Sequence, residues 1–187
     1  PVSYLDTPTE GQRLHSVSAD NTAIAYDATR RMIALGHRRI AFVRFILYTL
    51  RGIDPDASER QAGFVKAMNE AGLDATGIYS LLPGRDRQHS LLALLDKKPR
   101  YTAALCTSMD SAAVLAGEMK ALGREVPRDL SLCCVQGTYD RERISGAVLN
   151  FHDIAYRATL LLNRPKTPVI RERVSAVWQD RGTLVSC

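Results

Sequence analysis

The sequence lacks the patterns from which most enzyme and metal sites are predicted. It contains neither GxGxxG nor GxxxxGK[ST], so no glycine-rich loop can cradle a phosphate group, and it has no GxSxG elbow for a serine nucleophile. Its four histidines, His15, His37, His89 and His152, lie far apart, without carboxylates or cysteines at ligand spacing. We therefore expect no enzyme activity, no metal site and no cofactor.

Cysteine is scarce, and its placement argues against disulfide bonds. The four cysteines are Cys106, Cys133, Cys134 and Cys187. Cys133 and Cys134 are neighbours in an apolar run, where successive side chains of a strand point to opposite faces. We expect free thiols that pack as small apolar residues, and hence a reducing, cytoplasmic compartment.

Long apolar runs and a leader are also missing. No run approaches the roughly 20 residues of a membrane helix, and no signal peptide opens the chain, so we expect no membrane partner. The chain opens with "PVSYLD", which has no initiator methionine and resembles the middle of a strand. We expect it to be part of a longer protein.

A concentrated basic surface is absent as well, although the net charge is +5 and the isoelectric point about 9.2. Binding of nucleic acid requires Lys and Arg gathered on one face. Here the basic residues alternate with acids, as in "DASER", "YDRER" and "VIRERV". This pattern favours a solvated surface, and a direct nucleic-acid face on this chain remains the alternative.

The sequence does contain, twice, a helix that ends at a glycine and leads into a buried strand. In "DNTAIAYDATRRMIALGH", Asp20 can cap a helix, apolar residues recur at helical spacing, and Gly36 suits the closing turn. Residues 40–47 then read as a buried parallel strand. The basic residues 37–39 are expected to cap the helix and keep the loop solvated, and DNA contact is the alternative.

The second copy places a helix over residues 112–122, a stop at Gly123 and Pro127, and a strand over 130–135. Between the copies, Ser58 and Gln61 are expected to form a capping box for a helix that ends at Gly72. Strands are expected over residues 76–82 and 101–106, a helix over 87–98, and another helix from Asn150. This alternation predicts an α/β fold with a doubly wound parallel sheet.

The candidate site lies just after the strands, because ligands of open parallel sheets bind beyond the carboxyl ends of the strands. Arg60 falls in the first turn of a helix that starts at this edge. Its planar guanidinium suits a carboxylate, a phosphate or vicinal hydroxyls, and the alternative is a surface arginine paired with Glu59 or Asp56.

Three further polar residues belong to this candidate site. Asp20 and Asp110 each precede an expected helix, so each is either an N-cap or a ligand contact. Gln136 follows a buried strand and caps nothing, which makes it a candidate polar contact.

Four segments in order, "VSADNTAIAYDATRRMIALGHRRIAFV", "SERQAGFVKAMNEAGL", "PRYTAALCTSMDSAAVLAGEMKALGREVPRDLSL" and "RGTLVS", resemble the effector-binding core of the lactose and galactose repressor family of bacterial transcription regulators. The resemblance implies a periplasmic-binding-protein-like, doubly wound α/β fold with one lobe incomplete. Residues 1–37 and 147–187 would be remnants of the amino-terminal lobe, and residues 38–146 the carboxy-terminal, effector-binding lobe.

The resemblance also implies a function. The chain would bind a small-molecule effector between its lobes, form a homodimer, and act on operator DNA through a helix-turn-helix domain outside this chain. A solute-binding protein of a transport system, with the same lobes, is the alternative. A flavodoxin-like enzyme is a third class, for which no catalytic constellation is present.

Arg60 and Asp20 match family positions, whereas two ligand-binding positions differ. Met109 stands before Asp110 where the family usually has Asn, and Gln136 stands where it usually has a carboxylate. A buried hydroxyl left without its partner costs about 1–3 kcal/mol. We therefore expect an effector other than a simple neutral hexose, one that is anionic or less polar and suits Arg60.

Overall fold

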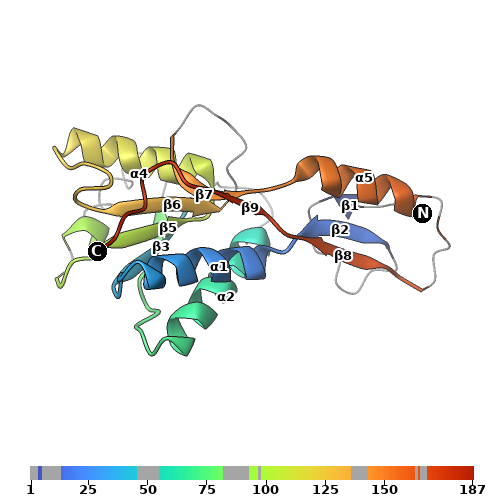
Figure 1. The fold of residues 1–187 in the computed structure, drawn as a ribbon, viewed down its shortest axis with the longest axis horizontal. Helices are drawn as coiled ribbons and strands as arrows, with labels where there is room; N and C mark the ends of the chain where they lie inside the picture. Colours follow the sequence, from blue (N-terminus) through green and yellow to red (C-terminus); the bar gives the residue numbers. More distant parts are fainter. Residues whose placement is uncertain are drawn as a thin grey trace.

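The computed structural model describes residues 4–5, 14–45, 55–81, 93–96, 98–135, 143–162, 164 and 168–187. These residues form two lobes joined end to end (Figure 1). We call the six-stranded sheet and the helices on its two faces the main lobe. The three-stranded sheet and the helix that covers it are the small lobe. In the part of the chain that the structure describes, no helix is long and apolar enough to cross a bilayer.

The main sheet confirms the predicted doubly wound architecture. Its strands lie in the order β4 (Ile78–Leu81), β3 (Ile40–Phe45), β5 (Ala103–Cys106), β6 (Ser131–Val135), β7 (Ser145–Val148) and β9 (Val177–Gln179). All neighbours are parallel except β7 and β9. Every residue of β5 and β6 is buried, as expected for parallel strands that helices cover on both faces.

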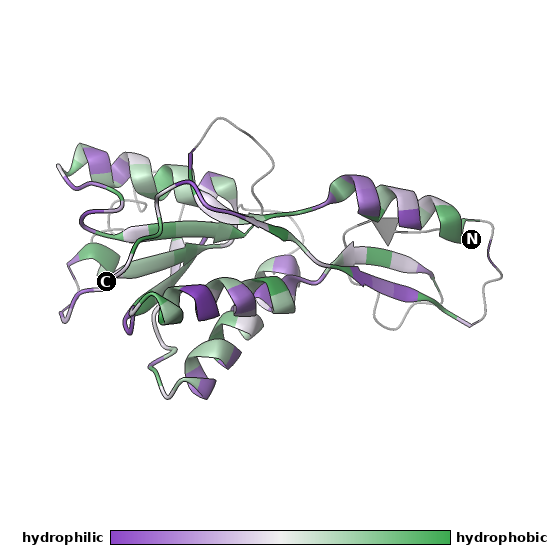
Figure 2. Ribbon diagram, viewed as in Figure 1, coloured by the Kyte–Doolittle hydropathy of each residue, from purple (hydrophilic) through white to green (hydrophobic). Residues whose placement is uncertain are grey.

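Helices α1 (Asn21–Ala34) and α2 (Pro55–Glu70) cover one face of the main sheet, and α4 (Met109–Ala121) covers the other. Successive strand residues serve opposite faces: Phe42 packs with Phe64 under α2, whereas Val43 packs with Leu115 under α4. Figure 2 shows the inner strands of the main sheet in green, the hydrophobic colour, and hydrophilic patches on the helices. Gly36 and Gly123, at φ 95° and 69°, close α1 and α4 as predicted.

The small lobe consists of β1 (Tyr4–Leu5), β2 (Ser16–Ala19) and β8 (Arg171–Val174), parallel and in that order, with α5 (Phe151–Leu161) packed on them. The side chain of Asn150 accepts a hydrogen bond from the backbone N–H of Asp153 at 3.0 Å, which is the predicted helix start. Within the described residues, the chain passes between the lobes three times, near residues 20, 150 and 175.

The division of the chain between the lobes differs from the expected one. Helix α1, expected in the amino-terminal lobe with residues 1–37, packs on the main sheet and on α2. Strand β9, expected there with residues 147–187, pairs with β7 of the main sheet. The main lobe therefore begins near Asp20 and includes the end of the chain. The apolar stripe of a helix shows that one face of the helix must be buried against a sheet, but it does not show which of the two sheets that is.

Two local predictions also fail. Helix α2 begins at Pro55, so Ser58 lies inside the helix and does not cap it. His37 is buried rather than part of a solvated loop, and its ring nitrogens lie 2.9 Å from Thr102 Oγ1 and 2.8 Å from the Val185 carbonyl oxygen. No local pattern around His37 indicates that the end of the chain returns to cover this turn. Arg38 does cap α1, through a 2.9 Å bond to the Ile33 carbonyl.

Candidate functional site

The carboxyl ends of the main-sheet strands point toward the small lobe (Figure 1). Helices α1, α2 and α4 begin at this same edge, so their free backbone N–H groups and positive dipole ends gather there. In parallel α/β sheets this is the edge at which ligands bind. The edge also faces the neighbouring lobe, so a molecule bound there can contact both sheets.

Arg60 is the central side chain of this edge, and it is only 3% exposed. Its Nε donates to Asn21 Oδ1 at 2.8 Å, and one terminal nitrogen donates to the Thr107 carbonyl at 2.7 Å. Its other terminal nitrogen lies 3.8 Å from Asp56 Oδ2. Arg60 thus joins the starts of α1 and α2 to the end of β5. Arg60 is therefore not a surface arginine, which was the alternative interpretation, although it does pair with Asp56 as that alternative expected.

Asp20 is the N-cap of α1, and its Oδ1 accepts the backbone N–H of Ala23 at 3.0 Å. This confirms the capping interpretation of Asp20. The next residue, Asn21, is fully buried and is the one that reaches Arg60. A ligand contact for Asp20 stays a prediction, and Asp20 also lines a hollow together with Ala147.

A second arginine ties this edge to the small lobe. Arg173 of β8 donates to the two carboxylate oxygens of Glu59 at 2.9 and 3.0 Å and to the Ala19 carbonyl at 3.3 Å. Glu59 also accepts a 3.4 Å bond from Asn21. Asn21 and Glu59 lie next to Asp20 and Arg60, in stretches that follow the strands and that the sequence marks as candidate site, but they were not singled out. Arg173 was missed, and it had no local signal, since its pairing with Glu59 spans 114 residues.

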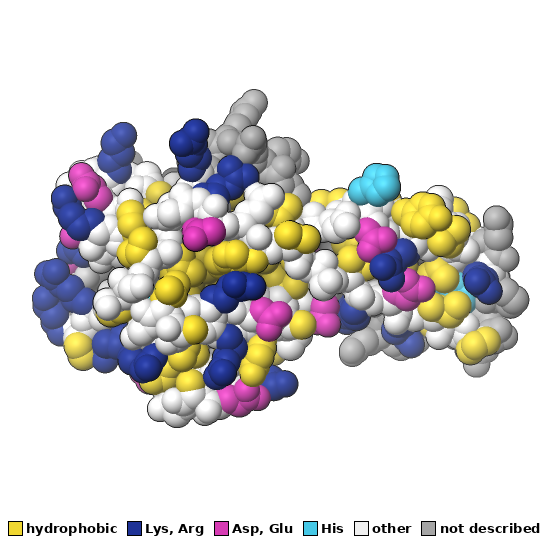
Figure 3. Space-filling view, viewed as in Figure 1, with side chains coloured by type: hydrophobic (Ala, Val, Ile, Leu, Met, Phe, Trp, Pro, Cys, Tyr) yellow, Lys and Arg dark blue, Asp and Glu magenta, His cyan; other side chains and the backbone are white. Residues whose placement is uncertain are grey.

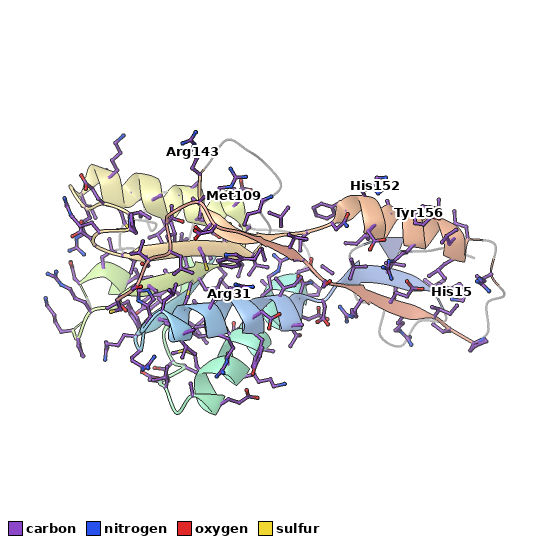
Figure 4. All side chains as sticks on the ribbon, in the orientation of Figure 1. His15, Arg31, Met109, Arg143, His152 and Tyr156 are labelled. Atoms are coloured by element: carbon purple, nitrogen blue, oxygen red, sulfur yellow. The ribbon has the colours of Figure 1, made fainter. Side chains whose placement is uncertain are left out.

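The start of α4 places Met109 and Asp110 at the same edge (Figure 4). Ser108, not Asp110, is the N-cap, and it forms a reciprocal capping box with Ser111. The capping interpretation of Asp110 is therefore wrong. Asp110 is exposed in the first helical turn, where a carboxylate is favoured by the helix dipole. Met109 is half-buried and packs against the core on the face that α4 covers.

The structure brings Arg60 and the α4 start together, because the Thr107 carbonyl that Arg60 binds lies two residues before Met109. Gln136 directly follows β6 but lies outside the described residues. A further guanidinium is close to the start of α2: Arg44 Nε donates to Ser80 Oγ at 2.9 Å, and a terminal nitrogen lies 3.5 Å from Gln61 Oε1. Within the described residues, no carboxylate forms an ion pair with Arg44.

Thiol chemistry is suppressed at this edge. Burial raises the pKa of the Cys134 thiol to about 12, although the Arg60 charge opposes the shift. Burial, followed by the charge of Cys134, raises the pKa of Cys106 well above its ordinary value, against a hydrogen bond from Ser111. Both remain protonated at neutral pH. Among the described residues, no cluster of three or more metal-ligating side chains occurs.

Comparison with known proteins agrees with this geometry. The family described as "periplasmic binding protein-like domain" matches residues 29–182. The transcriptional regulator AglR of Rhizobium meliloti is 31% identical over 122 residues, 62% of this chain and 32% of AglR. The regulator GntR of Escherichia coli K12 is 28% identical over 171 residues, 89% of this chain and 44% of GntR. The chain thus spans less than half the length of these relatives.

A solved LacI-family transcriptional regulator from Enterococcus faecium, with bound ribose, superposes with a TM-score of 0.78 at 18% identity. The superposition covers 100% of this chain and 71% of that protein, and it bears on the fold alone. Both curated relatives are transcription regulators, so the comparisons do not favour a solute-binding protein of a transport system. The chain belongs to the family of periplasmic binding protein-like domains.

Proposed function

We propose that this chain is the effector-sensing core of a bacterial transcription regulator. It binds a small molecule at the edge around Arg60 and has no catalytic activity of its own. The complete protein acts in the cytoplasm as a homodimer and contacts operator DNA through a helix-turn-helix domain outside this chain. The names of the curated relatives support the regulatory role.

The observation that carries the proposal is a continuous set of hydrogen bonds from the candidate site to the other lobe. Arg60 binds Asn21, Asn21 binds Glu59, and Glu59 binds Arg173 of the small lobe. An effector that changes the position of the Arg60 guanidinium therefore alters the contact between the lobes. Such an effector shifts the population of lobe arrangements by the difference in its affinity for them.

The effector is proposed to carry an anionic group. Arg44 and Arg60 supply two guanidinium groups near the start of α2, and Asp56, 3.8 Å from Arg60, is the carboxylate that balances them in part. Met109 offers a hydroxyl no hydrogen bond, which disfavours a neutral sugar. Asp20, Asp110 and Gln136 complete the proposed ligand-binding set.

Calorimetric titration with neutral hexoses, sugar acids, sugar phosphates and nucleobases tests the effector class. We expect an anionic compound to bind at least about tenfold more tightly than its neutral parent, a difference of about 1.4 kcal/mol. The variant Met109→Asn should reduce the difference in affinity between the anionic compound and its neutral parent, because it introduces an amide that can bind a hydroxyl. Tight binding of an ordinary neutral hexose to the unaltered chain would refute the proposed class.

X-ray scattering with and without the tightest ligand tests the sensing role. We expect a smaller radius of gyration when the ligand holds the lobes together. Operator affinity of the complete protein should change in parallel. If a ligand saturates the site and neither quantity changes, the chain is a binding protein and not a sensor.

A further inference from the structure

A second hollow lies between α1 and β9, and neither Asn21 nor Arg60 lines it. It encloses about 220 Å³. Its apolar floor is formed by Ile24 and four alanines, Ala23, Ala28, Ala147 and Ala176. In Figure 3 an apolar strip runs along β9, with basic and acidic side chains on its α1 border. The hollow is large enough for a molecule of about amino-acid size.

Four charged side chains line this hollow, Asp20, Asp27, Arg31 and Arg173, and two of them, Asp27 and Arg31, do not pair with each other. Asp27 and Arg31 are four residues apart on α1, a spacing at which an acid and a base normally form an ion pair. Instead, the Arg31 guanidinium lies over the Trp178 ring, 5.0 Å from its centroid (Figure 4). Within the described part of the chain, the Asp27 carboxylate has no hydrogen bond or ion pair. A negative and a positive group thus flank the apolar floor.

We propose that this hollow binds a small zwitterion of the amino-acid type. Its ammonium group pairs with Asp27, its carboxylate pairs with Arg31, and its side chain covers the alanine floor. The exposed Ser175 hydroxyl, also on the rim, is a second donor for the carboxylate. Arg31 can accept this role because an ion-paired hydrogen bond is stronger than a cation–π contact on a partly exposed ring.

The position of the hollow gives its occupant access to the lobe connections. Asp20 belongs to the first passage of the chain between the lobes, and Arg173, Ser175 and Ala176 belong to the third. An occupant therefore contacts both passages. The hollow shares Asp20 and Arg173 with the Arg60 edge, but Asp27, Arg31 and Trp178 belong to the hollow alone, so its occupancy can be measured on them whether or not the proposed function holds.

Trp178 is the only tryptophan of the chain, so its fluorescence reports on this hollow. We expect L-valine to cause a saturable change of Trp178 emission at roughly millimolar concentration or below. Isobutylamine lacks the carboxylate and isovalerate lacks the amine, and each should bind at least about tenfold more weakly. The indole N–H resonance of Trp178 provides a second readout that needs no variant.

Asp27→Asn and Arg31→Gln should each weaken L-valine binding at least about tenfold. Arg30→Gln alters an exposed arginine of α1 that does not line the hollow, and it should leave binding unchanged. Circular dichroism confirms that each variant is folded. The proposal is overturned if L-valine causes no saturable change in fluorescence or resonance position. It is equally overturned if isobutylamine binds as well as L-valine, or if Asp27→Asn binds it normally.

Discussion

Arg173 of the small lobe holds Glu59 of the main lobe with two nearly equal hydrogen bonds, 2.9 and 3.0 Å long. A planar guanidinium facing a carboxylate in this way fixes orientation as well as distance. The two side chains come from different sheets, so their pairing is sensitive to the angle between the lobes. The same Glu59 carboxylate accepts a hydrogen bond from the side-chain amide of Asn21, and the amide oxygen of Asn21 accepts one from Arg60. The two lobes and the candidate site are therefore connected through one carboxylate.

The variants Glu59→Gln and Arg173→Gln should each alter the arrangement of the two lobes while changing the free energy of unfolding only slightly. The side chains are 23% and 37% exposed, and partly exposed pairs contribute about 0.2–1 kcal/mol to folding. A double-mutant cycle of the unfolding free energy measures this coupling. Scattering should show a broader distribution of shapes for either variant, because the contact between the lobes is lost.

The pair Arg157 and Asp153 provides the control for that cycle. It is an ion pair of similar length, 2.9 Å, but both residues belong to α5. Its removal should cost a similar small amount of stability without altering the scattering curve. If Glu59→Gln leaves the scattering curve as unchanged as Asp153→Asn does, the Glu59 contact does not hold the lobes.

Arg60→Met should destabilise the main lobe by about 2–4 kcal/mol, because it leaves the buried Asn21 amide oxygen and the Thr107 carbonyl without their donor. Arg60→Lys keeps the charge, but a single ammonium cannot reproduce the planar fork that serves both acceptors. Denaturant unfolding should therefore rank the chains as unaltered, then lysine, then methionine. Equal stability of the lysine variant and the unaltered chain would contradict the fork geometry.

Gly63→Ala should disturb the candidate site from a distance. A methyl group at Gly63 would collide with the Thr22 carbonyl oxygen, so α1 and α2 would have to separate. We expect a loss of about 1–3 kcal/mol of unfolding free energy and a weaker contact between Arg60 and Asn21. Thermal unfolding measures the first effect, and effector titration measures the second.

Gly117→Ala is the matched control for this substitution. Gly117 is exposed within α4, and nothing lies near its added methyl group. The change should stabilise the chain by about 0.5–1 kcal/mol through helix propensity. If both alanine variants are stabilised, the close approach of α1 and α2 at Gly63 is not real.

Much of the fold follows from local sequence patterns, whereas the lobe assignment does not. Asp20, Gly36 and Gly123 mark helix ends through backbone chemistry that depends on nearby residues only, and all three lie where predicted. The assignment of α1 and β9 depends on which sheet lies next to them, and this is decided by contacts between distant parts of the chain. Local patterns contain no such information.

The residues of the candidate site also fall into two groups, those that local sequence patterns predict and those that only contacts between distant parts of the chain bring together. Arg60 was identified because an arginine near the beginning of an expected helix is a local feature, although α2 begins at Pro55 and Arg60 therefore lies in its second turn. Arg173 was not, because the alternating charges of "RERV" fit any exposed strand, and Glu59 lies 114 residues away. Asp110 was misassigned as a possible cap because Ser108 and Ser111 form an equally local capping box two residues earlier.

His37 predicts a dependence of stability on pH. Burial lowers the pKa of its ring below the ordinary 6.5, although the hydrogen bond to the Val185 carbonyl opposes the shift. The unfolded chain therefore takes up a proton at a higher pH than the folded chain. The unfolding free energy should fall as pH drops below about 6.5 and should level off once the folded ring is also protonated.

His37→Gln should flatten this slope, as measured by urea unfolding at a series of pH values. Thr102→Val removes the partner of the other ring nitrogen, so it should lower stability at every pH by about 1 kcal/mol while preserving the slope. A slope that survives His37→Gln unchanged would assign the pH dependence to another group.

The cysteines predict a simple labelling result. Cys106, Cys133 and Cys134 are buried, whereas Cys187 is exposed, and all four thiols are free. Burial also raises the pKa values of the three interior thiols, so they lack the reactive thiolate. A thiol reagent such as Ellman's should therefore modify one cysteine in the native chain and, because four are present, all four in denaturant. Cys187→Ser should reduce the native value to zero. Rapid modification of a second thiol under native conditions would mean that the main sheet opens to solvent, contrary to its packing between α1, α2 and α4.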